Sequence, residues 1–292
     1  MCDQYDVAAL IGPLSTDTLS SARALTQFAA LPLVSPVTVV PDTLPVLHPD
    51  NYVTFFPALS LWVEAVLNHM HGHGVQNLLI ISPQSGSYGD IFSAALERSA
   101  GNELEQVLRI NFQEPLRMRE LRRAIVNYDL LHAPDSALLF AGEIEDLPEL
   151  LELLSQVELR DVPLYGTDNL VPPLGYALSS EQGSFYLPEV SFTAPFARYE
   201  EFVTRFATKY GYTPDFHGVL GAECIFALAQ ALEDEGHYDP VAVVQALKAL
   251  TAPQPALRPA QQQSALMHPT STSAQGVQIK VMPVSAFVPA KE

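Results

Sequence analysis

Cysteine is nearly absent from this sequence. Its 292 residues include two cysteines, Cys2 and Cys224, which are far apart along the chain. Two such residues provide neither a disulfide framework nor the ligand spacing of a zinc site, so neither kind of cross-link is expected. Cys224 lies in an apolar pattern with helical spacing, which predicts a buried thiol.

Basic residues are also scarce. The chain has 15 lysines and arginines against 33 aspartates and glutamates, which gives a formal net charge of −18. This charge would repel nucleic acids and anionic membrane surfaces, so neither is an expected partner. Long apolar runs are missing as well. The best candidate, 219–232, is shorter than the ~18 residues that a membrane span requires, and Glu223 and Gln230 interrupt it.

Sequence motifs of enzymes are missing too. The chain has no G-x-G-x-x-G and no Walker-type G-x-x-x-x-G-K. The segment Gly86-Ser87-Tyr88-Gly89 does not make a G-x-S-x-G turn, because Ser85 takes the position of the leading glycine. We therefore predict that the protein is not an enzyme and that it uses no cofactor.

Three histidines, His69, His71 and His73, raise the question of a metal site. His69 and His73 would share a helix face if the helix continued, but Gly72 and Gly74 are expected to end it. No carboxylate or cysteine stands beside the histidines at ligand spacing. The sequence therefore predicts no metal site.

What the chain does contain is a regular alternation of short apolar runs and amphipathic stretches. Continuous apolar runs between helices predict strands that are covered on both faces, so the expected fold class is α/β with parallel sheets. A long loop is expected over 251–273 and a closing hairpin over 277–281 and 286–288. The predicted strands are 7–11, 31–34, 78–81, 105–111, 137–140, 162–165 and 184–190, and the predicted helices are 18–29, 59–71, 88–99, 116–127, 146–157, 198–210, 218–235 and 240–250.

Several segments carry a family resemblance through their order and spacing. They include VAALIGPLST at 7–16, ALPLVSPVTVVPD at 30–42, VPLYGTDNL at 162–170 and the helical stretch FVTRFATKYGYTPDFHGVLGAECIFALAQALEDEG. Together they resemble the leucine/isoleucine/valine-binding family of type I periplasmic solute-binding proteins, which serve ABC importers. The resemblance implies two lobes, each a parallel sheet flanked by helices, with a ligand in the cleft between the lobes.

Under this resemblance the first lobe comprises 1–58 and 196–275, and the second comprises 59–195 and 276–292. The family begins with a further β-α-β-α unit that holds the central strand of the first lobe, and nothing ahead of Val7 supplies it. We therefore expect an incomplete first lobe. Two explanations stay open: the chain is a fragment, or something else completes the lobe.

The resemblance places four candidate ligand contacts in the first lobe. In amino-acid binders of the family, the loops after the IGP strand and the SP strand hold the ligand carboxylate. Here those positions are Ser15 and Thr16, and Val37 and Thr38. Hydroxyl and backbone N–H groups at a helix start suit an anion. Ser15 and Thr16 could equally be ordinary N-caps, since a cap satisfies the same N–H groups.

Three further candidates lie in the second lobe. Asp168 follows LYG, where the family places an acid against the ligand ammonium, and Tyr88 in GSYGD matches an aromatic residue that packs over the ligand. Glu143 takes a position often held by an aromatic or small polar residue. Asp168 could instead be a turn residue, and Tyr88 a core aromatic at a helix start. An amino-acid-like ligand is the default expectation.

The function that the resemblance implies is non-catalytic binding of a small polar ligand by hinge closure, followed by delivery to an ABC permease in the membrane. It also implies a periplasmic or extracytoplasmic location, although no signal peptide is recognisable ahead of Val7. Two alternatives stay open. The chain could be the ligand-sensing domain of a receptor or regulator, or a truncated family member that binds nothing.

Overall fold

The structure of the protein is a computed structural model in which two compact units are distinct. It describes residues 7–28, 31–38, 51–84, 87–112, 118–126, 131, 133–159, 162–170, 184–190, 197–235, 238–251 and 277–283. Unit 1 comprises Met1–Ala58 and Val190–Gly276, and unit 2 comprises Leu59–Glu189 and Val277–Glu292. The second segment of the first lobe was predicted to span 196–275, and the corresponding segment of unit 1 spans 190–276. That the units act as lobes around a ligand stays a prediction.

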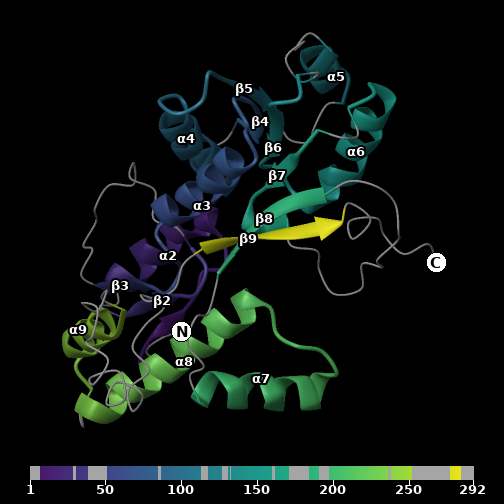
Figure 1. The fold of residues 1–292 in the computed structure, drawn as a ribbon. Helices are drawn as coiled ribbons and strands as arrows, with labels where there is room; N and C mark the ends of the chain where they lie inside the picture. Colours follow the sequence, from purple (N-terminus) through teal and green to yellow (C-terminus); the bar gives the residue numbers. More distant parts are fainter. Residues whose placement is uncertain are drawn as a thin grey trace. The chain divides into compact units, whose positions relative to one another are not determined.

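Unit 1 contains a parallel sheet with the strand order β1-β2-β3. The strands are β1 (Leu10–Ile11), β2 (Leu33–Ser35) and β3 (Tyr52–Thr54). Their register pairs residue 10 with 33 and residue 33 with 52. The helices described in this unit (Figure 1) are α2 (Thr16–Phe28), α7 (Ala197–Tyr210), α8 (Phe216–Glu235) and α9 (Pro240–Thr251).

Helices pack against this small sheet and give it a core. Successive side chains of a strand point to opposite faces, so Leu33 and its partner Tyr52 lie on one face, where they pack with Leu19 of α2. Helix α8 contacts β2, and helix α9 contacts β3. Cys224 of α8 is a fully buried free thiol, which confirms the prediction made for it. Burial, together with the charge of Glu223, raises the pKa of that thiol.

Unit 2 contains a larger sheet with the strand order β5-β4-β6-β7-β8-β9. The pairs from β5 to β8 are parallel. Its strands are β4 (Asn77–Pro83), β5 (Gln106–Phe112), β6 (Ser136–Phe140), β7 (Leu164–Gly166), β8 (Ser184–Val190) and β9 (Val277–Pro283). Its α-helices are α3 (Leu59–Gly72), α4 (Tyr88–Ala100), α5 (Met118–Val126) and α6 (Leu147–Gln156).

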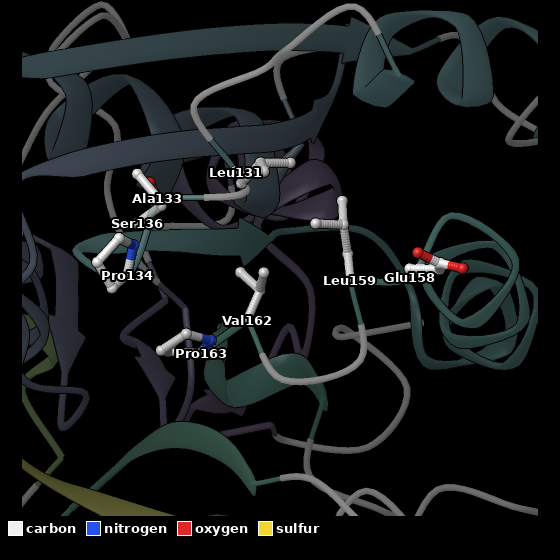
Figure 2. Close-up of a pocket in the computed structure, with 8 residues that line it drawn as sticks. All are labelled: Leu131, Ala133, Pro134, Ser136, Glu158, Leu159, Val162 and Pro163. Atoms are coloured by element: carbon white, nitrogen blue, oxygen red, sulfur yellow. The ribbon is translucent and has the colours of Figure 1, made fainter.

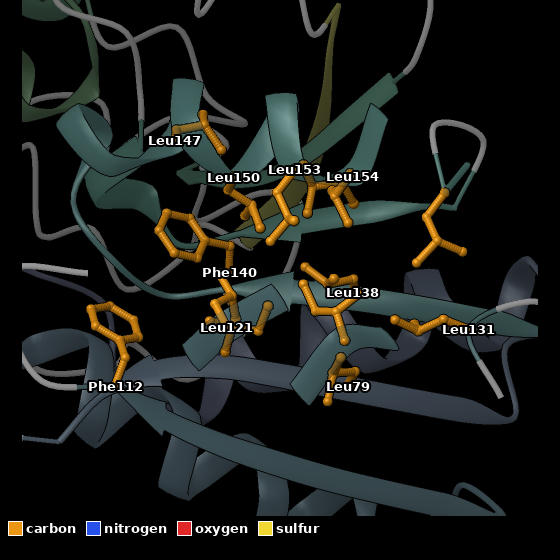
Figure 3. Packing of buried hydrophobic residues seen from close by; sticks show 14 of the residues in the cluster. Leu79, Phe112, Leu121, Leu131, Leu138, Phe140, Leu147, Leu150, Leu153 and Leu154 are labelled. Atoms are coloured by element: carbon orange, nitrogen blue, oxygen red, sulfur yellow. The ribbon is translucent and has the colours of Figure 1, made fainter. Parts of the chain in front are cut away.

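Both faces of this sheet are covered, as the continuous apolar runs predicted. Every residue of β4 and β6 is buried. Helices α3 and α4 lie on one side of the sheet, and α5 and α6 lie on the other (Figure 1). Figure 3 shows the leucines of α6 over β6, where four of them pack with Leu138 and Phe140. Each such leucine stabilises the fold by roughly 1.5–3 kcal/mol through burial. The four leucines are Leu147, Leu150, Leu153 and Leu154.

The α/β class with parallel sheets flanked by helices is confirmed. The first strand is shorter than the predicted 7–11, because only Leu10 and Ile11 find partners in β2. The first strand of the predicted hairpin is β9, which neighbours β8 in the sheet. The second strand, 286–288, lies outside the described residues. The predicted loop 251–273 also lies outside them, except for Thr251. In the part of the chain that the structure describes, no helix is long and apolar enough to cross a bilayer.

Candidate ligand-binding site

The predicted residues of unit 1 lie at the carboxyl edge of its sheet. Ser15, which is exposed, and Thr16 come after β1, and Val37 and Thr38 come after β2, the neighbour of β1. In parallel α/β sheets, ligand sites form beyond the carboxyl ends of the strands. Helix α2 begins at Thr16, so its first backbone N–H groups are at this edge. The four residues therefore belong to two adjacent loops.

A chain of hydroxyl groups holds the loop after β2. The Ser35 hydroxyl donates to the carbonyl oxygen of Pro13 (3.0 Å), which ties β2 to the loop after β1. Oγ of Ser35 in turn accepts hydrogen bonds from the hydroxyl (2.6 Å) and the backbone N–H (3.2 Å) of Thr38. Because the hydroxyl hydrogen of Thr38 is used in this way, the Tyr52 hydroxyl is the donor in its 2.7 Å contact with Thr38 Oγ1.

This network decides what Thr38 and Val37 offer. Thr38 is fully buried and its hydroxyl is satisfied inside the protein, so it shapes the loop, and its contact with a ligand stays a prediction. Val37 is partly exposed. Burial raises the pKa of Tyr52, although hydrogen bonds with the neighbouring hydroxyls oppose the rise, so the phenol remains a neutral donor.

Helix α2 also buries a cation that is not among the predicted site residues. Arg23 is 7% exposed, and its guanidinium carbon lies 5.6 Å from the centre of the Tyr52 ring, within cation–π range. Its Nε atom is buried and has no hydrogen-bond partner among the residues described. The signal was available in the sequence, because Arg23 shares a helix face with Leu19 and Thr26, which are both buried.

The predicted residues of unit 2 follow β4, β6 and β7, which are consecutive in the sheet. Tyr88 is the first residue of α4, and its hydroxyl donates to Oδ1 of Asp168, which begins the short helix η4 (Asp168–Leu170). Tyr88 is 8% exposed and Asp168 is 2% exposed. Burial, followed by the negative charge of Asp168 and the hydrogen bond to it, raises the pKa of Tyr88 well above its usual value. The phenol is therefore a donor at any physiological pH.

Two neighbours of this pair differ in exposure. Glu143 is exposed after β6, at the start of the short helix η3 (Ile144–Asp146). Thr167, between β7 and Asp168, is fully buried, and no described residue is a hydrogen-bond partner of its Oγ1. The structure thus joins Tyr88 to Asp168 directly and places Glu143 at the same edge of the sheet. Thr167 was missed, although it lies inside the quoted motif VPLYGTDNL.

Polar contacts fix the helix that carries Tyr88. Ser87 caps α4 by accepting a hydrogen bond from the backbone N–H of Asp90 (3.5 Å). Arg109 of β5 pairs with the Asp90 carboxylate, and its Nε donates to the Ser82 hydroxyl of β4 (2.8 Å). The first turn of α4 is therefore tied to two strands of the sheet, which sets the position of the Tyr88 ring.

A pocket of about 210 Å³ lies at the other end of the same sheet (Figure 2). It is at the amino ends of β6 and β7, since Ser136 begins β6 and Pro163 directly precedes β7. Most of its lining is apolar, and Glu158 contributes the charged side chain at its rim. Because this is the edge opposite to Asp168, we do not assign it to the candidate site. The pocket is lined by Leu131, Ala133, Pro134, Ser136, Glu158, Leu159, Val162 and Pro163.

Solved structures with a similar fold are solute-binding proteins of ABC transporters. A leucine-binding protein from Thermotoga maritima has a TM-score of 0.70 at 15% identity, over 85% of this chain and 70% of that one. A branched-chain amino acid transporter substrate-binding protein from Streptococcus pneumoniae, in complex with isoleucine, has a TM-score of 0.66 at 16% identity, over 86% and 70%. A solute-binding protein from R. palustris, in complex with benzoate, has a TM-score of 0.67 at 13% identity, over 87% and 70%.

No family model matches the sequence, and no curated protein matches it. The likeness to the solved structures therefore concerns the fold, which is that of ABC-transporter solute-binding proteins. The resemblance that the sequence motifs carried is confirmed at this level. The ligand is a separate question, because the proteins that share the fold hold ligands as different as isoleucine and benzoate.

Proposed function

We propose that this chain is a non-catalytic binding protein for a small polar ligand with an ammonium group, such as an amino acid. One observation carries the proposal: the buried Tyr88–Asp168 pair lies at the carboxyl edge of a parallel sheet, in a fold shared with solute-binding proteins. A carboxylate accepts hydrogen bonds only and can take several at once, so the bond from Tyr88 is compatible with a role of Asp168 in binding an ammonium group. Tyr88 would also cover the ligand with its ring.

The other end of the ligand would be a carboxylate held by unit 1. The first N–H groups of α2 and the exposed hydroxyl of Ser15 are suited to an anion, because the start of a helix carries positive partial charge. Val37, in the loop after β2, would contact the same end of the ligand. Thr38 would hold that loop in place through its hydrogen bonds to Ser35. Glu143, at the carboxyl edge of the sheet of unit 2, would discriminate between ligands with different side chains.

The binding cycle would be hinge closure of two lobes on the ligand. Binding shifts a population between open and closed states only if the ligand makes different contacts in the two. Residues from both units supply such a difference, since the open state would offer contacts from one unit alone. We further propose that the closed form is read by an ABC permease and that the protein acts in the periplasm or at the outer surface of a membrane.

Thermal unfolding of the full chain against a panel of amino acids, with benzoate as a ligand without an ammonium group, tests the proposal. A ligand that binds the native state alone stabilises it by about 2.7 kcal/mol at a hundred times its dissociation constant, which raises the midpoint by a few degrees. We expect an amino acid to do this and benzoate to fail. Asp168→Asn should abolish the shift, and Tyr88→Phe should reduce it.

Glu158→Gln is the matched control, because it removes a carboxylate at the opposite edge of the same sheet. It should leave the shift intact. An equal shift in Asp168→Asn and in the wild type would contradict the assignment of the site. A shift with benzoate and with no amino acid would contradict the proposal that the ligand carries an ammonium group. It would still agree with the fold of a solute-binding protein.

A further inference from the structure

The pocket at the amino ends of β6 and β7 lies at the opposite edge of the sheet from the candidate ligand-binding residues of unit 2. Its lining residues come from two parts of the chain, between 131 and 136 and between 158 and 163 (Figure 2). Leu131 and Leu159 are almost fully buried, and Val162 and Pro163 are partly buried, so the walls are apolar. A volume of about 210 Å³ is on the scale of cavities that hold one small aromatic ring. The pocket can therefore take an apolar body of that size.

Helix α6 ends beside this pocket with an uncommon residue in its cap. The N–H of Leu159 donates to the carbonyl of Leu154 (2.9 Å), and the N–H of Glu158 donates to the carbonyl of Ser155 (3.4 Å). These two bonds define a Schellman motif, whose left-handed position is usually glycine because a Cβ atom is strained there. Here that position is Glu158, with a φ of +60°. Among the described residues it is the one non-glycine residue with a positive φ.

Electrostatics also disfavours a carboxylate at this place. The carboxyl end of a helix carries negative partial charge, and the last turn of α6 has no basic residue to offset it. No described residue forms a hydrogen bond or an ion pair with the carboxylate of Glu158. Arg160 and Asp161 follow it outside the described residues, and their opposite charges cancel in sum. A residue that is strained and unfavourably charged indicates a functional requirement, and this one lines an apolar pocket.

We propose that this pocket is a second binding site, for an organic cation in which an ammonium group is joined to a small apolar body and which has no carboxylate. The apolar body would lie between Leu131, Leu159 and Val162, and the ammonium group would pair with Glu158 at the rim. A carboxylate on the ligand would be repelled by Glu158 and by the end of α6, so amino acids are not ligands of this pocket. The net charge of −18 favours the approach of a cation.

Ligand-detected NMR titration of the full chain at neutral pH and low ionic strength tests the proposal. The probes are benzylammonium, benzyl alcohol and benzoate, which share one ring and differ in charge. Benzylammonium should bind saturably and about fivefold more tightly than benzyl alcohol, near the upper end of what an accessible ion pair contributes. Benzoate should bind most weakly. Absence of saturable binding by benzylammonium, or equal affinities for the three probes, would overturn the proposal.

Glu158→Gln is the decisive variant, and Glu152→Gln is its matched control. Glu158→Gln should lower the affinity for benzylammonium about fivefold and leave that for benzyl alcohol unchanged. Glu152 is an exposed carboxylate of the same helix that does not line the pocket, so its replacement removes the same charge and should have little effect. Equal affinity of Glu158→Gln and wild type, or equal losses in the two variants, would contradict the ion pair at the rim.

Two further variants test where the probe binds. Ala133→Phe, at a partly exposed position of the lining, should fill the pocket and abolish binding of benzylammonium and benzyl alcohol alike. Asp168→Asn should leave both affinities unchanged, because Asp168 lies at the opposite edge of the sheet. Loss of benzylammonium binding in Asp168→Asn, or its retention in Ala133→Phe, would refute the location. The second site can thus fail while the proposed amino-acid site stands, and the reverse.

The strain at Glu158 gives an independent readout. Glycine adopts a left-handed conformation without the penalty of a Cβ atom, so Glu158→Gly should raise the midpoint of thermal unfolding by roughly 2–4 °C. The same variant should lose the preference for benzylammonium over benzyl alcohol. A gain in stability together with a loss of cation binding is the expected result if Glu158 is retained for binding. A lower midpoint, or an unchanged preference for the cation, would overturn that argument.

Discussion

Replacing Gly89 by alanine should be one of the most damaging small changes in unit 2. Gly89 is the second residue of α4, and a Cβ atom added there would lie 1.9 Å from the carbonyl oxygen of Ala141 and 3.2 Å from Cδ of Pro83. Cβ atoms in proteins essentially never come within 3.0 Å of such an atom, so the helix start would have to move by about 1.1 Å (3.0 − 1.9).

The size of the effect follows from what blocks the methyl group. The obstacle is a backbone oxygen just beyond β6, which no rotamer change can move, and Ala141 is itself held by a hydrogen bond from its N–H to the carbonyl of Ile81 (2.9 Å). Overpacking of this kind costs about 1–3 kcal/mol, and we expect the upper end. At about 2–4 °C for each kcal/mol, the midpoint of thermal unfolding should fall by roughly 6–12 °C.

Gly72→Ala is the control for this measurement. Gly72 is also helical, at the end of α3, and a Cβ atom there would meet no atom within 4 Å apart from its chain neighbours and the backbone of its own helix. Because alanine is the better helix former, this variant should be unchanged or more stable by up to about 1 kcal/mol. A Gly89→Ala protein that unfolds within a degree of the wild type would refute the close approach of α4 to Ala141, and with it the fixed position of Tyr88.

Two further predictions concern polar groups of unit 1. Asp215→Ala should lower the free energy of unfolding by about 1 kcal/mol, because this carboxylate caps α8 by accepting from the Gly218 N–H (2.8 Å), whereas Asp215→Asn keeps the cap. Hydrogen bonds from His217 and Gly218 lower the pKa of Asp215. The stabilisation by its charge is therefore present above pH ~4 and is lost as the pH falls through the lowered pKa. Urea unfolding at neutral and acidic pH should show this loss in the wild type and not in Asp215→Asn. Thr38→Val should cost about 1–3 kcal/mol in the same assay, since it leaves two buried hydroxyl groups without this partner. Thr208→Val, at an exposed position, should stay within about 0.5 kcal/mol of the wild type, and equal effects of the two threonine variants would contradict the supporting role of Thr38.

Much of the fold could be predicted from the sequence, because it depends on local patterns. The strand Ser184–Val190 was predicted with the same bounds, and the helix at 59–71 within one residue, since a continuous apolar run and an amphipathic period are both visible within a short window. The pairing of β9 with β8 could not be predicted in this way. These strands are separated by nearly ninety residues along the chain, and no local pattern specifies which strand becomes the neighbour.

The candidate site divides along the same line. Asp168 and Tyr88 could be assigned to a strand end and a helix start, because turn and cap residues mark those places in the sequence. Their hydrogen bond could not be predicted, since it joins residues 80 positions apart. Thr38 became a candidate ligand contact through the family resemblance, and that contact stays a prediction. Its hydroxyl also joins Ser35 and Tyr52, and these partners are identified only once β2 and β3 are paired.

The end of α3 shows how a correct local rule can still give an incomplete prediction. Glycine was expected to end the helix, and the regular helix does end at Gly72. The residue that terminates the hydrogen-bonding pattern, however, is Gly74, because its left-handed conformation closes the Schellman motif two residues later. That difference of two residues places His73 on the face of His69 instead of in a loop. The stacking of the two histidine rings therefore depends on a cap geometry that residue types alone do not reveal.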